Sequence, residues 1–176
     1  MLIILLVMGL KQLLADQNDI RLNQLFNELK LDKTEKEHKQ NIQDIWTIWH
    51  EHEDSNIMKW MIQATYIMEK GMYAESLKLL NIIIARDNDF SEAYNKRATL
   101  YFMMGKYQDS IIDIEKTLSL EPRHFGALSG MALILIEKEK YRAAIEVYEK
   151  IKLITPHDHS LEEKIDFLNQ ELSLST

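Results

Sequence analysis

The feature that most restricts the fold is an internal repeat with a period of 34 residues. Shifted by that distance, the sequence aligns with itself without a gap from Ile57 to Asp158, which gives three units at 57–90, 91–124 and 125–158. A period of this length is typical of arrays in which each unit is one small motif and the stacked units share a continuous core. The repeat therefore predicts a modular stack rather than a single closed core.

The first half of every unit predicts a helix. Its fourth, eighth and eleventh residues are apolar or aromatic, and the eighth is always alanine. Steps of four and three place these side chains on one stripe of a helix, and the small alanine indicates that another helix comes close. The stripe consists of Trp60, Ala64 and Ile67, then Tyr94, Ala98 and Tyr101, then Leu128, Ala132 and Leu135.

A tight turn and a second helix follow in each unit. Gly71 and Gly105 each stand two residues before a tyrosine, and glycine readily takes the backbone conformation that ends a helix, whereas the third unit has Glu139 at this place. Pro122 and Pro156 close two of the units. The second helix has a small residue where it meets the first and a large one a turn later. These are Ser76 and Leu80, Ser110 and Ile114, and Ala144 and Tyr148.

On these residues the chain resembles the tetratricopeptide repeat family, over 102 of its 176 residues. The resemblance implies an all-α fold, a right-handed α-solenoid of three helix-turn-helix units, and a role in binding other proteins. Asn88 stands where the family usually has proline, and Arg97 matches a common arginine that is expected to support neighbouring helices. NKRATLYFMMGKYQDS and EPRHFGAL are also similar to uncharacterised bacterial repeat proteins, which often carry export signals. The family also usually has alanine at one position of the second helix, where this chain has Ile83, Thr117 and Ile151.

The flanking segments are predicted to cap the array, because an end unit otherwise exposes its apolar face. Residues 16–56 predict a helical hairpin, interpreted as a degenerate extra unit packed on the first repeat, with Thr34 and Glu37 as the capping box of its second helix. The first helix of unit 57–90 is apolar on nearly every side and is expected to be covered on both flanks. Residues 159–176 predict a capping helix and tail, with an apolar stripe of Leu161, Ile165, Leu168 and Leu172.

Residues 1–15 predict either a signal peptide or a retained apolar helix. The nine apolar residues 2–10 are far fewer than the ~20 that a membrane-spanning helix needs. They match the core of a secretory signal that is cleaved after Ala15, although no Lys or Arg precedes them and Leu13 is large for its position. The expected localisation is exported or periplasmic, and the alternative is cytoplasmic.

Charge and composition exclude several classes of function. A net charge of −7 disfavours nucleic acid as a partner, because its phosphates repel an acidic chain. The sequence has no cysteine and therefore no disulfide or thiolate chemistry. It also has no glycine-rich phosphate loop and no nucleophile-elbow motif, so we expect no cofactor and no enzymatic activity.

Two pairs of histidines raise the question of a metal site. In IWTIWHEHED, His50 and His52 are two residues apart and so face opposite sides of a helix, whereas helical chelates use ligands three or four apart. The segment is therefore interpreted as a solvated helix end. His157 and His159 lie in a predicted polar turn, and neither pair is expected to bind a metal. A metal-dependent hydrolase is kept only as a remote alternative.

The concave face of the array is the predicted binding site. It is formed by first-helix residues that point away from the core stripe, and it is rich in methionine, whose unbranched side chain adapts to varied apolar surfaces. We expect it to bind an apolar peptide or helix of a partner protein. Alternatively, the chain's own helix or a second copy fills it, as in a self-assembling structural protein. The groove residues are Met58, Met61, Ile62, Thr65, Met68, Asn95, Lys96, Thr99, Phe102, Met103, Gly126, Gly130 and Leu133, together with Glu92.

One partner class of the family is not expected, namely the acidic carboxyl tails of heat-shock chaperones. Family members hold such tails with lysines, asparagines and an arginine on the first helices. The matching positions here hold Met61, Thr65, Lys96, Gly126 and Gly130, which cannot neutralise a terminal carboxylate and its acidic neighbours. The two glycines leave the floor of the third unit bare. They either admit the backbone of a ligand, or mark a helix start or a contact within the chain.

Overall fold

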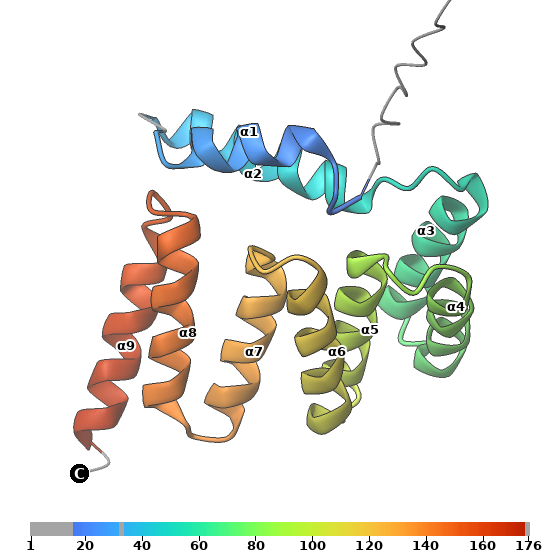
Figure 1. The fold of residues 1–176 in the computed structure, drawn as a ribbon. Coiled ribbons are helices and arrows are strands. Elements are labelled where there is room, and N and C mark those ends of the chain that lie inside the picture. The colour runs from blue at the N-terminus through green and yellow to red at the C-terminus, as the bar shows by residue number, and fades with distance from the viewer. Residues whose placement is uncertain (1–15, 32–33, 175–176) are drawn as a thin grey trace, which may run out of the picture.

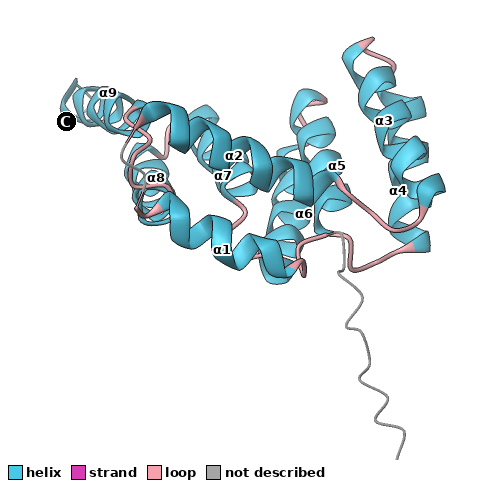
Figure 2. Cartoon of the chain, turned by 90° about the horizontal axis from the view of Figure 1, so that it is seen from above, coloured by secondary structure: helices cyan, strands magenta, loops and turns pink. Residues whose placement is uncertain are grey.

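The computed structural model describes residues 16–31 and 34–174, and all regular structure in these ranges is helical (Figures 1 and 2). The prediction of an all-α solenoid is confirmed. The apolar segment 2–10 and the predicted cleavage after Ala15 fall outside the described residues. The helices of the described part are α1 (Ile20–Leu29), α2 (Glu35–His50), α3 (Ser55–Glu69), α4 (Tyr73–Arg86), α5 (Ser91–Met103), α6 (Tyr107–Leu120), α7 (Phe125–Glu137), α8 (Tyr141–Ile154) and α9 (Ser160–Leu174).

Three helix pairs lie side by side and form the repeat array: α3 with α4, α5 with α6, and α7 with α8 (Figure 1). The repeated alanines Ala64, Ala98 and Ala132 are buried at the contact between the helices. The hydroxyl of Ser76 donates a 2.8 Å hydrogen bond to the carbonyl of Ala64, and the hydroxyl of Ser110 does the same to Ala98. The small residues therefore allow the two helices of a pair to pack closely, so that a serine side chain of one helix reaches the backbone of the other.

The turn inside each pair has the same geometry in all three repeats. The backbone φ angle is 75° at Gly71, 70° at Gly105 and 55° at Glu139. The next residue then donates its N–H to a carbonyl five positions earlier, as Lys140 does to Leu135 at 2.8 Å. This is the helix ending that favours glycine, so Glu139 completes the turn with strain that the two glycines do not have.

We expect Glu139→Gly to stabilise the protein by about 0.5–1 kcal/mol. It relieves left-handed strain of roughly 1–2 kcal/mol, and the greater freedom of glycine in the unfolded chain cancels part of that gain. Urea unfolding followed by circular dichroism would measure the change. The control is Gly105→Ala, which introduces strain at the matching place, where no atom lies within 4 Å of the added methyl group. A stability loss in both variants would contradict this explanation.

The N-terminal hairpin does not lie where the sequence predicted. Figure 1 shows α1 and α2 lying across the ends of α5 to α8, rather than stacked on α3 as an extra repeat. Phe26 of α1 and Trp49 of α2 are buried in one cluster with Phe125 and Leu128 of α7. The start of α7 presents aromatic and aliphatic side chains that match the aromatic stripe of α2, and this contact decides the position of the hairpin.

Polar contacts fasten the hairpin to the loops of the array. The side-chain amide of Gln17 donates to the carbonyl of Asp89 at 2.6 Å and accepts the N–H of Ser91 at 3.1 Å. The guanidinium of Arg123 lies 4.2 Å from the ring centre of Phe26, a cation–π contact. Within the hairpin, Thr34 caps α2: its hydroxyl oxygen accepts the N–H of Glu37 at 3.2 Å, and its hydroxyl donates to the Glu37 carboxylate at 2.9 Å, which is the N-cap part of the predicted capping box.

One side of α3 is consequently open. Ile62 is 68% exposed and Tyr66 is 59% exposed, so the expectation that this helix is covered on both flanks is wrong. At the other end of the array, α9 packs on α8 and buries Leu161, Ile165 and Leu168. The array therefore has a covered end at α9 and an apolar open side at α3. In the two described ranges, no helix has both the length and the hydropathy to cross a membrane.

Candidate functional site

The predicted groove residues differ widely in their exposure. Met61, Met68 and Asn95 are buried, because they lie where one first helix packs against the next, α3 on α5 and α5 on α7. The others are at least partly accessible, and both their place on a shared binding face and any role in binding a ligand stay predictions. The partly buried ones are Met58, Thr65, Lys96, Phe102, Gly126 and Gly130, and the exposed ones are Ile62, Thr99, Met103 and Leu133.

A hollow of about 360 Å³ lies on the concave face beside the first repeat, and we call it the α3 hollow. Its wall is formed mostly by α3, whose exposed side chains Ile62 and Tyr66 border it, while His50 of α2 and Lys96 of α5 supply basic groups. The hollow is therefore an apolar depression with a polar end. Its full lining is His50, Met58, Met61, Ile62, Thr65, Tyr66, Glu69 and Lys96.

On the third repeat, a helix of the same chain covers part of the predicted groove. A methyl group added at Gly126 would clash with the indole of Trp46, whose Cζ2 atom would be only 2.9 Å away. Trp46 also packs edge-on against Phe125, with ring centres 5.4 Å apart. Of the two predicted roles for this glycine, the structure shows the contact within the chain. Gly130 is different, because its nearest neighbour would be Ile114 at an ordinary 3.4 Å.

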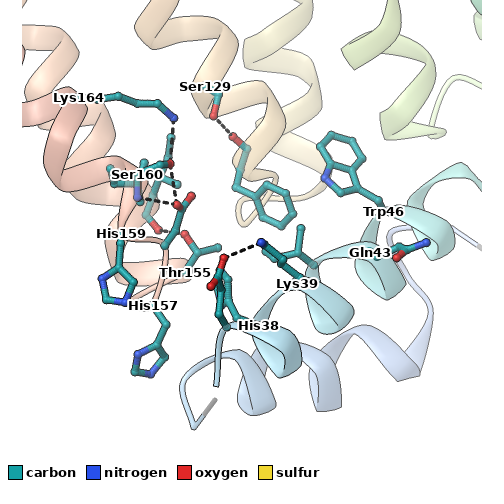
Figure 3. A pocket seen from close by; sticks show the side chains of 16 residues that line it. His38, Lys39, Gln43, Trp46, Ser129, Thr155, His157, His159, Ser160 and Lys164 are labelled. Atoms are coloured by element: carbon teal, nitrogen blue, oxygen red, sulfur yellow. Dashed lines mark hydrogen bonds and ion pairs between the residues drawn. The ribbon is translucent and has the colours of Figure 1, made fainter. Parts of the chain in front are cut away.

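A second and larger hollow, of about 570 Å³, lies between α2, α7 and the α8–α9 turn, and we call it the α2–α9 hollow (Figure 3). Trp46, Phe125 and Leu161 give it apolar walls. Figure 3 shows Trp46 at one end and His157, His159 and Lys164 toward the other, with Lys39 and Thr155 between them. The hollow thus combines an aromatic end with a rim of basic and hydroxyl groups.

One face of α2 borders both hollows. Glu35, Lys39, Ile42 and Trp46 border the α2–α9 hollow, and His50 borders the α3 hollow. These residues follow one another at steps of three or four, so they share a side of the helix. The site in the structure is therefore a concave face with α2 as an added wall, which is a shape that the three repeats alone would not have.

A buried carboxylate stands where α2 meets the array. Glu92 of α5 is 0% exposed, and one of its oxygens is 2.8 Å from the side-chain nitrogen of Asn95 and 3.1 Å from Nε2 of His124. The other oxygen is 3.1 Å from Nε2 of His50 and 3.5 Å from Nζ of Lys96. Burial acts to raise the pKa of Glu92, but the hydrogen bond of His124 and the close contacts with His50 and Lys96 hold this pKa well below its ordinary 4.5. Glu92 is therefore an internal anion and not a groove residue.

The segment IWTIWHEHED does end a helix, since α2 stops at His50. Of its two histidines, His50 is partly solvated, with a side chain that is 42% exposed, whereas His52 is not solvated as predicted. His52 is only 7% exposed at its side chain, lies 2.9 Å from a carboxylate oxygen of Asp87 and packs against Phe90. The end of this segment therefore packs on the loop between α4 and α5. Among the described residues, no three His, Cys, Asp or Glu side chains are grouped so that they could hold a metal ion.

Arg97 supports helices, as predicted. Its guanidinium donates two 2.7 Å hydrogen bonds to the carboxylate of Asp113 on α6 and a third, also 2.7 Å, to Asn81 on α4. It also lies over the rings of Tyr94 and Tyr101. The bonds to Asp113 join the two helices of one repeat and the bond to Asn81 joins two repeats, so the side chain is held between the helices.

The joint role of Trp46, His124 and Glu92 was missed by the sequence reasoning. The sequence placed Trp46 on the correct face of α2, but predicted that this face packs on the first repeat, whereas it packs on Phe125 of α7. His124 accepts the N–H of Ala127 and so caps α7, although histidine is not among the usual capping residues. The signal in the sequence was the pair His124 and Gly126. A polar residue and a glycine stand there at the start of α7, which is otherwise apolar.

Comparisons with known proteins give the family. Residues 91–124 and 126–158 match the family described as Tetratricopeptide repeat. A TPR repeat-containing protein of Rhizobium etli is 35% identical over 153 residues, which are 87% of this chain and 75% of that protein. Zinc finger CCCH domain-containing protein 7B of Homo sapiens is 36% identical over 78 residues, 44% of this chain and 8% of that protein.

Solved structures share the fold. The first TPR of Spaghetti (RPAP3), bound to the HSP90 peptide SRMEEVD, has a TM-score of 0.61 at 17% identity and covers 66% of this chain and 93% of its own. MamA has a TM-score of 0.61 at 19% identity and covers 79% of this chain and 77% of its own. At such identities the likeness shows the fold alone. The Rhizobium relative, however, is similar enough over enough of its length to decide the family, in agreement with the repeat match, and this chain belongs to the tetratricopeptide repeat proteins.

Proposed function

We propose that this protein is a non-catalytic scaffold that binds an apolar peptide or helix of a partner protein on its concave face. The observation that carries the proposal is the α3 hollow, which has Ile62 and Tyr66 exposed on one wall in the described structure. Exposed apolar side chains that border a hollow usually mark an interface, because water does not stabilise them. Met58, which is partly accessible, adapts that wall to partners of varied shape.

Structural neighbours support a peptide as the partner. The RPAP3 domain is bound to an HSP90 peptide, and the TPR2B domain of yeast Sti1 is in a complex with pHsp70. We propose a different chemistry of recognition for this chain. Where family members place their tail-binding side chains, Met61 is buried in the core, Gly126 is covered by Trp46, and Lys96 is paired with Glu92. An apolar side chain of the partner, and not an acidic tail, would then be the anchor.

The test replaces two exposed side chains that border the α3 hollow. Partners recovered with the full chain from its own cells are mapped to a short peptide, and the Kd of that peptide is measured by fluorescence anisotropy. We expect Ile62→Gln with Tyr66→Gln to raise this Kd at least about tenfold, because each buried apolar side chain contributes roughly 1.5–3 kcal/mol. Met61→Glu is unsuitable as a probe, since Met61 is 4% exposed and a charge there would unfold the repeat.

The matched control is Ile82→Gln with Ile112→Gln. These side chains are 50% and 55% exposed on the second helices α4 and α6, away from the concave face. The control should leave the Kd unchanged. Equal weakening by both pairs, or normal binding by the α3 pair, would show that the peptide does not bind in this hollow.

A second candidate function is self-assembly, and the open side of α3 favours it. Ile62 and Tyr66 on the array's uncovered first repeat could pack on a second copy rather than on a foreign peptide. Light scattering over a concentration series separates the two proposals. A monomer at every concentration removes self-assembly, whereas a dimer that the α3 pair disrupts supports it.

A further inference from the structure

His50 lies between two groups that can only accept hydrogen bonds. Its Nδ1 is 2.6 Å from the carbonyl oxygen of Trp46, and its Nε2 is 3.1 Å from a carboxylate oxygen of Glu92. Neutral imidazole carries a proton on one nitrogen and a lone pair on the other, so one of these contacts would be repulsive. Both contacts are favourable only in the imidazolium form. The geometry therefore favours a positively charged His50.

His124 and His52, whose side chains are buried, have the opposite geometry. Nδ1 of His124 accepts the backbone N–H of Ala127 at 3.1 Å, and Nδ1 of His52 accepts the backbone N–H of Asp54 at 2.9 Å. An accepting nitrogen has no proton, so each ring is neutral and donates from Nε2, His124 to Glu92 and His52 to Asp87. His124 thus gives Glu92 a hydrogen bond without a charge.

The charge of Glu92 is balanced unevenly across its two oxygens. Oε2 lies within 3.1 Å of both Asn95 and His124, which are neutral donors. Oε1 has no well-aligned hydrogen bond in the described part of the chain, but the cations of His50 and Lys96 stand 3.1 Å and 3.5 Å away. Because Glu92 is fully buried, losing one of these two cations leaves an anion poorly compensated in a medium of low dielectric.

We infer that His50 and Glu92 form a protonation-dependent latch, which holds the N-terminal hairpin on the second repeat while His50 is charged and loosens when His50 loses its proton. His50 is the last residue of α2 and Glu92 lies in the first turn of α5, so the pair joins the hairpin to the array directly. The latch does not depend on any ligand in the α3 hollow.

Every element packed around His50 contributes charged or titratable groups. α5 supplies Glu92 and Lys96, and the loop before α7 supplies the neutral His124. α3 supplies Tyr66 and Glu69, which line the same hollow as His50. On its own segment, the following residue Glu51 is paired with Arg21 of α1. Glu92 is therefore the acid that balances His50, and Lys96 is the cation that opposes its protonation.

The direction of the pH dependence follows from the two partners. Burial lowers the pKa of His50, but its contacts with Glu92 and with the Trp46 carbonyl outweigh burial, so the pKa lies above its ordinary 6.5. Stability from a raised pKa is complete below 6.5 and is lost as the pH rises through the pKa of the folded state. The lowered pKa of Glu92 gives stability above 4.5 that is lost on acidification. The latch is strongest between these two values.

The direct experiment is a histidine titration of the full chain by NMR, with ¹⁵N and ¹³C ring shifts assigned by single substitutions. We expect His50 to be doubly protonated at pH 6.5 with its midpoint above that value. In Glu92→Gln the midpoint of His50 should move downward. A midpoint for His50 at or below 6.5 in the native protein would overturn the latch.

The energetic experiment compares the native chain with His50→Gln by urea unfolding at pH 6 and pH 8.5. Glutamine can still donate to Glu92 but has no charge, so the native chain should unfold at a clearly higher urea midpoint at pH 6, and the difference should shrink severalfold at pH 8.5. His157→Gln is the control, because this exposed histidine lies in the α8–α9 turn, and its difference from the native chain should not change with pH. A His50→Gln difference that is constant with pH would also refute the latch.

Discussion

Gly126→Ala is expected to destabilise the protein by about 2–3 kcal/mol, although it adds a single methyl group to a helix. That methyl group would clash with Cη2 of Trp46 and would lie 2.9 Å from Cζ2 of the same ring and 3.3 Å from His124. The indole cannot retreat easily, because it packs edge-on against both Trp49 and Phe125. Urea unfolding followed by circular dichroism would measure the loss.

Gly130→Ala is the matched control on the same helix. An added methyl group there would make only an ordinary contact of 3.4 Å with Ile114, and alanine favours an interior helix position over glycine by about 1 kcal/mol. We therefore expect Gly130→Ala to be neutral or stabilising. In a Trp46→Ala background, the cost of Gly126→Ala should largely disappear, because the two sites are in contact. Equal effects of the two glycine substitutions would contradict the position of Trp46.

The array was predictable from the sequence because its determinants recur at fixed places. Ala64, Ala98 and Ala132 mark the close approach of the paired helices, and Gly71 and Gly105 mark the turns. Each of these residue types has one dominant physical reason for its position. Repetition then makes a coincidence improbable, so register and fold class follow without coordinates.

The position of the hairpin was not predictable in the same way. The stripe that contains Trp46 and Trp49 shows that one face of α2 is buried, but burial of an apolar face does not specify the partner surface. Stacking on α3 would have continued the array, whereas the structure packs the hairpin on Phe125 and Leu128. That choice depends on three-dimensional shape complementarity, which no periodicity encodes.

For the groove, the sequence predicted which helix faces point away from the core stripe, but not which residues on those faces are exposed. A helical wheel distinguishes the core stripe from the other faces, but it does not say how closely one first helix approaches the next. Met61 and Asn95 were therefore assigned to the concave face, and close packing of α3 on α5 and of α5 on α7 buries them. Glu92 was assigned there too, and only the hairpin, which supplies His50, turns it into a buried anion.

Trp49→Ala is expected to cost about 3–5 kcal/mol, the largest loss among the substitutions considered for this chain. Trp49 is 0% exposed and stacks on His124 with ring centres 4.0 Å apart and planes 9° from parallel. It also contacts Phe26 of α1 and Phe125 of α7. Its removal would leave a cavity at the point where the hairpin, the second repeat and the third repeat meet.

Trp60→Ala provides the comparison, because Trp60 is a partly buried tryptophan of α3 that packs in a different cluster. With part of its surface already in water, its loss should cost no more than about 2 kcal/mol. Hydrogen exchange adds a readout of location: Trp49→Ala should speed exchange of the α1 and α2 amides before those of α3 and α4, and Trp60→Ala should do the reverse. If Trp49→Ala cost less than Trp60→Ala, the hairpin would be an attachment to the array, and its aromatic cluster would not be part of the core that holds the protein folded.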